Sequence, residues 1–371
     1  MRRYFLTLNV LSVQPCIKTG NLFFFFFFFP GIKMVANNTS HLLSDCSTLS
    51  QTTDVALACF FFLLLPFALT FNVIAAWVSL HLHSTSTFIV YLKNLVAADL
   101  LLALTLPFMA ASMLYRAPFE LKAFTCRYSS VIFYCCMYTS IALMGLISLD
   151  RFFKIVRPFG KLLGQNVLFS LVMSTLVWVI MFGGTGIPTI ILTNQYPVNM
   201  TEISCLSFKS PSGVQFHKTV ILCMEVFFWF AAILIVFCYI CITVKVLQSF
   251  RNSGSNNSQG KKKTKLRVFL VLFVFFVCFV PLHLMRIPFQ LYEILGIKMC
   301  TEMWVVRVHD VVLWLSTTAS CLDPLLYIYL CREYKDKLDE MMKAVRICVG
   351  LHSAQHMKRT QKNNKQSFHL I

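Results

Sequence analysis

The sequence predicts an all-α fold, a seven-transmembrane helix bundle with a short amphipathic eighth helix. The composition is the first reason, because 57% of the 371 residues are hydrophobic and only 13% are charged, whereas soluble domains carry about 25% charged residues. Thirty-seven Phe residues are more than one water-soluble core can bury. The second reason is seven apolar stretches of the length that crosses a bilayer, roughly 20 residues each. The third is a net charge of +18 that gathers on one side of these stretches.

The chain begins with residues 1–33, which we interpret as a doubtful leader. Phe23–Phe29 is a run of Phe residues followed by Pro30. This run is too short to span a bilayer, and no small-residue signal-peptide cleavage site follows it. We therefore expect translation to start at Met34 and residues 34–54 to form an extracellular tail.

Residues 55–330 are predicted to form the transmembrane domain. Its connections are short except for Arg251–Lys265, a polar and then basic segment that we expect to be a flexible cytoplasmic loop. No two halves of the domain resemble each other, which argues against an inverted-repeat transporter. The expected spans are Val55–Leu80, Phe88–Leu114, Tyr128–Leu149, Val167–Leu192, Thr219–Val246, Val268–Leu295 and Met303–Leu330.

Residues 331–348 carry apolar residues at helical spacing among charges, so an amphipathic helix on the membrane surface is expected. Cys348 at its end is a candidate palmitoylation site. Residues 349–371 complete the chain as a cytoplasmic tail.

The distribution of charge predicts the orientation. Most of the net charge lies in the second inner loop, in residues 245–267 and after residue 331. The positive-inside rule makes that side cytoplasmic, so the N-terminus lies outside in the plasma membrane. The lipid bilayer explains the basic charge without a nucleic-acid partner.

The outer side carries sequence features of an extracellular surface. Three glycosylation sequons begin at Asn37, Asn38 and Asn199. Four Cys residues also lie outside the spans, and they allow three disulfide connectivities: Cys46, Cys126, Cys205 and Cys300.

Charged residues inside a bilayer are costly and are candidates for function. They are few in this chain: Asp99, Asp150, Arg151, Glu225, Arg286, Asp310 and Asp323. The sequence shows no nucleophile–base constellation, so an enzyme is not expected.

Asp150-Arg151-Phe152 ends the third span at its inner face, and this position makes the chain resemble the rhodopsin-like G-protein-coupled receptors. The resemblance runs from about Ala36 to Arg346. It includes further motifs in the other spans: Asn72, Leu95-Val-Ala-Ala-Asp99, Trp178, Tyr239, Cys278-Phe-Val-Pro281 and Asp323-Pro-Leu-Leu-Tyr327.

The resemblance implies roles for several of these residues. Asp150 would hold Arg151 in the inactive state, and Tyr239 and Tyr327 would join Arg151 in coupling to the G protein. No cofactor is expected; the resemblance implies only an allosteric sodium ion, which would lie among Asp99, Ser140, Ser320 and Asp323. The disulfides would be Cys126–Cys205 and Cys46–Cys300.

The sixth span, Cys278–Pro288, is similar in more detail to the purinergic nucleotide receptors, in particular those that answer to ADP or nucleotide sugars. Phe88–Asn94, Ser130–Tyr134 and Ile191–Asn194 share this similarity. It implies an extracellular nucleotide-like ligand and an inhibitory G protein as partners.

Arg286 and His283 share one helix face, and the planar Arg fork suits phosphate oxygens. Further candidates for ligand binding are Tyr134, Tyr138, Lys209, His217 and His309. The alternative is that Arg286 pairs with Glu225 or Asp310 and only holds helices together.

Several positions depart from the nucleotide receptors and make the predicted pocket less cationic: Met109, Ile203, Ser204, Glu225, His309 and Asp310. A lysophospholipid receptor or an orphan receptor is therefore the alternative within the family, and a channel or transporter is the alternative outside it. Phe133 stands where amine receptors carry Asp, and Thr317 where opsins carry the retinal Lys. These two residues argue against both ligand classes.

Overall fold

The computed structural model describes residues 39–83, 86–114, 116–156, 166–194, 196, 205–252, 258–295 and 303–347. The chain divides into two compact units between Asp45 and Cys46, and the seven spans belong to the second. Asn37, Asn38, Asn199, Cys300 and Cys348 lie outside the described residues, as does the side chain of Cys46.

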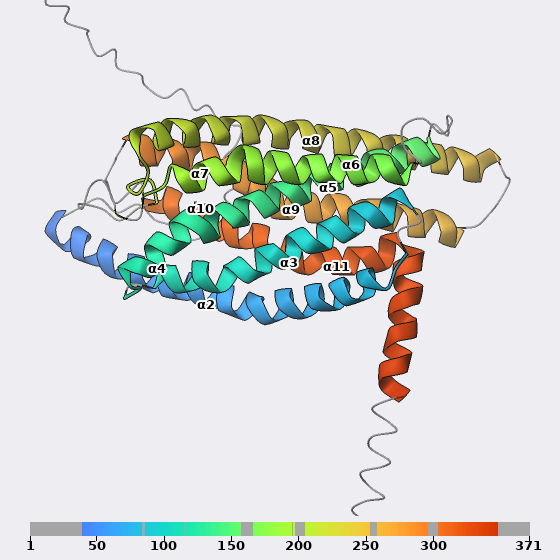
Figure 1. The fold of residues 1–371 in the computed structure, drawn as a ribbon, viewed down its shortest axis with the longest axis horizontal. Helices are drawn as coiled ribbons and strands as arrows, with labels where there is room; N and C mark the ends of the chain where they lie inside the picture. The colour runs from blue at the N-terminus through green and yellow to red at the C-terminus, as the bar shows by residue number, and fades with distance from the viewer. Residues whose placement is uncertain are drawn as a thin grey trace, which may run out of the picture. The chain divides into compact units, whose positions relative to one another are not determined.

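The described residues contain seven helices long and apolar enough to cross a membrane, which confirms the predicted fold class. Figure 1 shows them running side by side along one axis. The spans are Thr52–Leu80, Thr87–Met113, Phe119–Ile155, Val167–Ile191, Pro211–Arg251, Val268–Gln290 and Val305–Tyr329.

Several spans consist of more than one helical element. The first span lies in α2 (Thr39–Leu80) and the second in α3 (Thr87–Met113). The third consists of α4 (Phe119–Phe124), which a π-helical turn joins to α5 (Ser130–Ile155). The fourth comprises α6 (Val167–Trp178), a π-helical segment (Val179–Gly186) and α7 (Ile187–Ile191). The remaining spans lie in α8 (Pro211–Asn252), α9 (Ser258–Leu295), and the pair α10 (Met303–Thr317) and α11 (Ala319–Leu330).

Local sequence explains where two of these helices begin. Ser86 precedes α3, and its hydroxyl accepts a hydrogen bond from the amide of Ile89. Asn166 precedes α6 and accepts from the amide of Leu168 at 2.9 Å. Both side chains satisfy amides that a helix leaves without an intrahelical partner.

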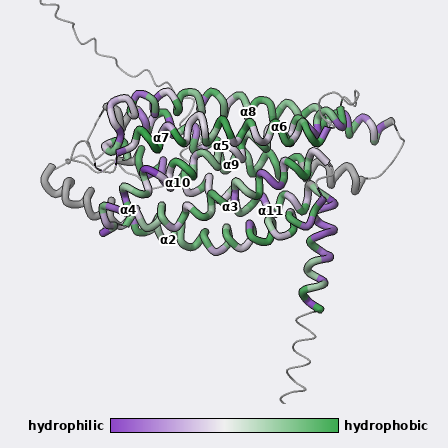
Figure 2. The backbone as a smooth tube through the Cα atoms, in the orientation of Figure 1, coloured by the Kyte–Doolittle hydropathy of each residue, from purple (hydrophilic) through white to green (hydrophobic). Residues whose placement is uncertain are grey.

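Helix α5 forms the centre of the bundle, because it packs against both α3 and α8. Large apolar side chains on other faces remain exposed, among them Leu63, Phe67, Phe230 and Ile233. Figure 2 shows the same apolar character along the whole length of the bundle. Exposed apolar side chains on fully hydrogen-bonded helices are the form that a bilayer requires.

Residues 332–347 form a further helix, as the sequence predicts. Figure 1 shows it as a red ribbon that turns sharply away from α11. Tyr334 and Met341 are buried on it, whereas Ile347 is exposed. Hydrophilic and hydrophobic stretches alternate along it in Figure 2.

The structure places helix ends differently from the prediction at four spans. Helix α2 begins at Thr39, within the segment expected to be an extracellular tail. The third and fifth spans also extend beyond their apolar stretches. Helix α9 begins at Ser258, so the expectation of a flexible loop over Arg251–Lys265 is wrong for its second half. A helix continues into polar sequence as long as nothing ends it, so the apolar stretch marks only its central part.

Candidate functional site

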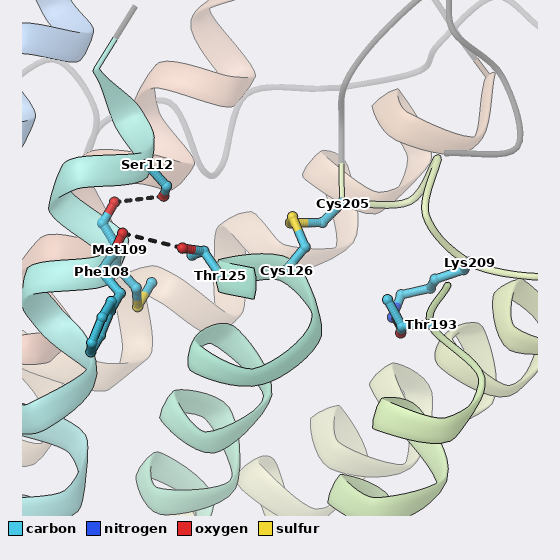
Figure 3. Close-up of a disulfide and its surroundings, with 8 residues drawn as sticks. All are labelled: Phe108, Met109, Ser112, Thr125, Cys126, Thr193, Cys205 and Lys209. Atoms are coloured by element: carbon cyan, nitrogen blue, oxygen red, sulfur yellow. Dashed lines mark hydrogen bonds between the residues drawn. A yellow bond between two sulfur atoms is a disulfide. The ribbon is translucent and has the colours of Figure 1, made fainter. Parts of the chain in front are cut away.

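A disulfide joins Cys126, at the start of the third span, to Cys205, and their Cα atoms are 5.2 Å apart. This confirms one of the two predicted pairs, while Cys46–Cys300 lies outside the described residues. Figure 3 shows the bond next to Thr125, whose hydroxyl donates to the carbonyl of Phe108 at 3.2 Å. We call this end of the bundle the disulfide end.

A cavity of about 400 Å³ opens at the disulfide end, and both disulfide cysteines line it. Six of the seven predicted ligand-binding residues also line it: Tyr134, Tyr138, Lys209, His217, Arg286 and His309. A cavity of this size with few polar groups in an apolar wall is typical of small-molecule sites.

Arg286 lies at the inner part of this site and is 6% exposed. Its Nη1 donates to the hydroxyl of Tyr138 at 3.0 Å. Its guanidinium lies over the ring of Tyr134, with Cζ 4.6 Å from the centroid. The Nε atom is 3.7 Å from Oε1 of Glu225. Of the two carboxylates expected to compete for Arg286, Glu225 is therefore the one that lies next to it.

Asp310 contacts other groups instead. Its carboxylate lies 3.9 Å from Nη1 of Arg307 and 3.5 Å from Nδ1 of His309. Arg307 forms an ion pair with Asp54 of α2 as well. The predicted alternative of an Arg286–Asp310 pair is therefore wrong, because Asp310 has nearer cations on its own helix.

His283 supports the cavity without lining it. It is 1% exposed, and its Nδ1 lies 2.9 Å from the carbonyl of Phe279. This carbonyl can only accept, so Nδ1 carries the proton and Nε2 accepts from the Tyr138 hydroxyl at 3.1 Å. The prediction that His283 contacts a ligand directly is not met, because Tyr138 lies between it and the cavity wall.

Below the cavity, aromatic rings form a column. The ring of His283 stacks on Phe228 at 3.5 Å between centroids, and Phe228 stacks on Phe275 at 5.7 Å. Phe279 follows, 5.7 Å from Phe275. We call His283, Phe228, Phe275 and Phe279 the ring column.

Two lysines complete the charge of the site. Nζ of Lys209 donates to the hydroxyl of Thr193 at 3.3 Å, beside the disulfide (Figure 3). Lys122 of α4 also lines the cavity, although it precedes the predicted third span and is not among the predicted ligand-binding residues. Only its position in the sequence could have indicated this role, because Lys122 lies four residues before Cys126 and the helix is continuous between them.

A buried polar cluster lies at the centre of the bundle. The hydroxyls of Ser140 and Tyr327 donate to the two oxygens of Asp99, at 3.1 and 3.0 Å. Asp323 lies within hydrogen-bonding reach of Asp99, and both are 1% exposed. Ser320 differs from the prediction, because its hydroxyl donates to the carbonyl of Thr317. Three of the four predicted residues therefore meet.

The opposite end of the bundle carries Asp150 and Arg151, but they do not pair. The carboxylate of Asp150 lies 2.9 Å from Nζ of Lys154 and accepts from the hydroxyl of Thr87. The guanidinium of Arg151 lies over the ring of Phe88, 4.1 Å from its centroid. The expected Asp150–Arg151 pair is wrong because residues four apart share a helix face, whereas neighbours point in different directions.

The two tyrosines predicted to join Arg151 have different surroundings. Tyr239 is buried and within electrostatic range of Arg151. Tyr327 instead contacts Asp99 in the central cluster.

Comparison with known proteins agrees with this arrangement. The family described as 7 transmembrane receptor (rhodopsin family) matches residues 71–327. Purinoceptor 13 of Homo sapiens is 39% identical over 270 residues, 72% of this chain and 75% of the relative. Purinoceptor 14 of Bos taurus is 33% identical over 327 residues, 87% of this chain and 94% of the relative.

A further relative is G-protein coupled receptor 87 of Mus musculus. It is 34% identical over 330 residues, which cover 88% of this chain and 91% of the relative. Residues 71–327, which match the family, contain the cavity, the central cluster and the Asp150–Arg151 end. The chain therefore belongs to the rhodopsin family of seven-transmembrane receptors, in its purinergic subgroup.

Proposed function

We propose that the cavity at the disulfide end binds an extracellular nucleotide or nucleotide sugar, and that the receptor signals through an inhibitory G protein. The disulfide end and the N-terminus then face outside. As a family member, the chain is a multi-pass plasma-membrane receptor rather than an enzyme, and its partners are an extracellular ligand and a G protein.

The observation that carries the proposal is Arg286 at the cavity. A planar guanidinium fits phosphate oxygens in two hydrogen bonds, and Lys209 and Lys122 line the same space. Tyr134 and Tyr138 offer aromatic faces on which a base can stack. The names of the similar purinoceptors point to the same ligand class.

The test is Arg286→Ala, with ADP, UDP-glucose and lysophosphatidic acid each applied to membranes that hold the receptor and a purified G protein. Truncating one side of a buried charge pair costs about 2–5 kcal/mol, so the potency of the nucleotide agonist should fall at least about thirtyfold. Nucleotide exchange is measured separately on inhibitory, stimulatory and phospholipase-coupled G proteins, and we expect it on the inhibitory type.

Arg307→Ala is the matched control, because Arg307 is an Arg of the same end that pairs with Asp54 and does not line the cavity. Its nucleotide potency should stay within about threefold of wild type. Normal potency in a well-expressed Arg286→Ala receptor would contradict the proposal. Activation by lysophosphatidic acid alone would point to the lysophospholipid class instead.

We infer in addition that the central cluster holds a sodium ion. Two adjacent buried carboxyl groups cannot both stay charged unless a cation lies between them. Without a cation, one of the two takes up a proton. Oδ2 of Asp323 has no hydrogen-bond partner among the described residues, so it is available as a ligand atom. The carboxylates of Asp99 and Asp323 and the hydroxyl of Ser140 fit an oxygen-preferring cation, which would lower the charge of the cluster.

A further inference from the structure

Glu225 lies beside the ligand cavity without lining it. It follows the lining residue Met224 on α8 and is 3% exposed. Neither carboxylate oxygen has a hydrogen-bond partner among the described residues, although Trp229 lies within range to interact. A buried carboxylate with so few stabilising contacts is costly to the fold. Its presence beside the site therefore indicates a role in ligand binding.

Arg286 separates Glu225 from the cavity. Glu225 approaches the guanidinium at Nε, at 3.7 Å. Tyr138 holds Nη1 at 3.0 Å, and the ring of Tyr134 covers one face. Arg286 itself lines the cavity. A ligand anion and Glu225 therefore compete for one cation from two sides.

This arrangement reduces the charge that the site offers to an anion. Three fixed cations line the cavity among the described residues, namely Arg286, Lys122 and Lys209, and Glu225 offsets the first. An anion held by Arg286 lies on the order of 7 Å from the Glu225 carboxylate, because the guanidinium lies between the two anions and contacts each of them. At an effective dielectric constant of about 35, between that of a protein site and that of water, each negative charge placed there weakens binding roughly tenfold.

Phosphate groups differ in this charge. A terminal phosphate carries about −1.5 to −2 charge at pH 7, whereas a phosphate bonded on both sides carries a single negative charge. We propose that Glu225 is a specificity-determining residue, which favours ligands whose phosphates are all bonded on both sides, such as a nucleotide sugar, over ligands that end in a free phosphate. This inference rests on the proposed function.

The experiment compares UDP-glucose with ADP on wild type and on Glu225→Gln, at equal surface expression, by G-protein nucleotide exchange. Glutamine keeps the shape and removes the charge. The substitution should lower the half-maximal concentration of UDP-glucose about tenfold, because the phosphate at Arg286 carries one charge, and that of ADP about thirtyfold to a hundredfold, because its terminal phosphate carries more. The ratio of the two potencies should therefore change about three- to tenfold in favour of ADP. Glu225→Met removes the same charge and replaces Glu225→Gln in this comparison if the Gln variant fails to reach the cell surface.

Asp310→Asn is the matched control. It removes a carboxylate at the same end that contacts Arg307 and does not line the cavity, so it should leave the ratio of the two potencies unchanged. An equal shift for both ligands in Glu225→Gln, a loss of ADP potency, or the same change in Asp310→Asn would overturn the inference.

A second measurement separates this inference from the proposed function. Inorganic pyrophosphate is added to the purified receptor, and the rise in its unfolding temperature is recorded. If no nucleotide activates any variant, but pyrophosphate stabilises Glu225→Gln more than wild type, the nucleotide proposal fails and the role of Glu225 stands. If the substitution leaves the effect of pyrophosphate unchanged, the role of Glu225 is wrong.

Discussion

Asp99 and Asp323 bring two carboxyl groups together in the buried centre of the bundle, where charge is most expensive. If sodium joins them, the folded receptor binds the ion and the unfolded chain does not, so sodium stabilises the fold. A sodium concentration tenfold above the dissociation constant adds about 1.4 kcal/mol. The purified receptor should therefore unfold at a higher temperature in sodium chloride than in choline chloride of the same ionic strength.

Asp323→Asn should abolish this difference between the salts. Ser320→Ala is the control, since the Ser320 hydroxyl bonds the carbonyl of Thr317 and no hydrogen bond joins it to Asp99 or Asp323 among the described residues. Equal unfolding temperatures of the wild type in both salts would refute the sodium proposal.

At the scale of the helical elements, the fourth span approaches α5 closely at Gly186, beside the cavity. A Cβ atom added at Gly186 would lie 3.0 Å from Sγ of Cys135, whereas one added at Gly184 would meet nothing within 4 Å. Gly186→Ala should therefore lower the free energy of unfolding by about 1–3 kcal/mol through overpacking. Gly184→Ala, the matched control, should be neutral or raise it by up to about 1 kcal/mol.

Thermal unfolding of the purified receptor checks both variants. Because the contact at Gly186 is with one sulfur atom, adding Gly186→Ala to a Cys135→Ala receptor should cost much less than adding it to wild type. An equal cost in the two backgrounds would show that the sulfur does not limit the approach of the helices.

At the scale of the whole molecule, the ligand cavity and Arg151 lie at opposite ends of the bundle. Arg151→Ala should therefore leave ligand binding within about threefold of wild type. It should nevertheless reduce agonist-driven nucleotide exchange at least tenfold, because Arg151 is the residue proposed to contact the G protein. Radioligand binding and nucleotide exchange on the same membranes measure the two effects.

Arg116→Ala, at the disulfide end, is the control for loss of an arginine, and we expect both readouts to be unchanged. Loss of binding together with exchange in Arg151→Ala would mean that the residue supports the fold instead.

The sequence was sufficient to predict the seven spans, because their apolar character is imposed by lipid and is visible residue by residue. It could not place the start of the third span, since Glu120, Lys122 and Arg127 are polar and still helical. The preference of Asp150 for Lys154 follows from helical spacing and can be predicted from the sequence. The π-helical segment beside Cys135 depends on packing between spans, which the order of residues does not reveal.

The ring column gives the floor of the cavity a mechanical property. Stacked rings at contact distance resist compression, and Arg286 is joined to the top ring through the Tyr138 hydroxyl. A ligand that pulls on Arg286 cannot be accommodated by a soft local rearrangement. The pull must shift Phe228 of α8 together with three rings of α9 that span about two helical turns. A contact of a few atoms at Arg286 is thereby converted into strain between α8 and α9, and the stiffness of the aromatic stack sets how much of it is transmitted.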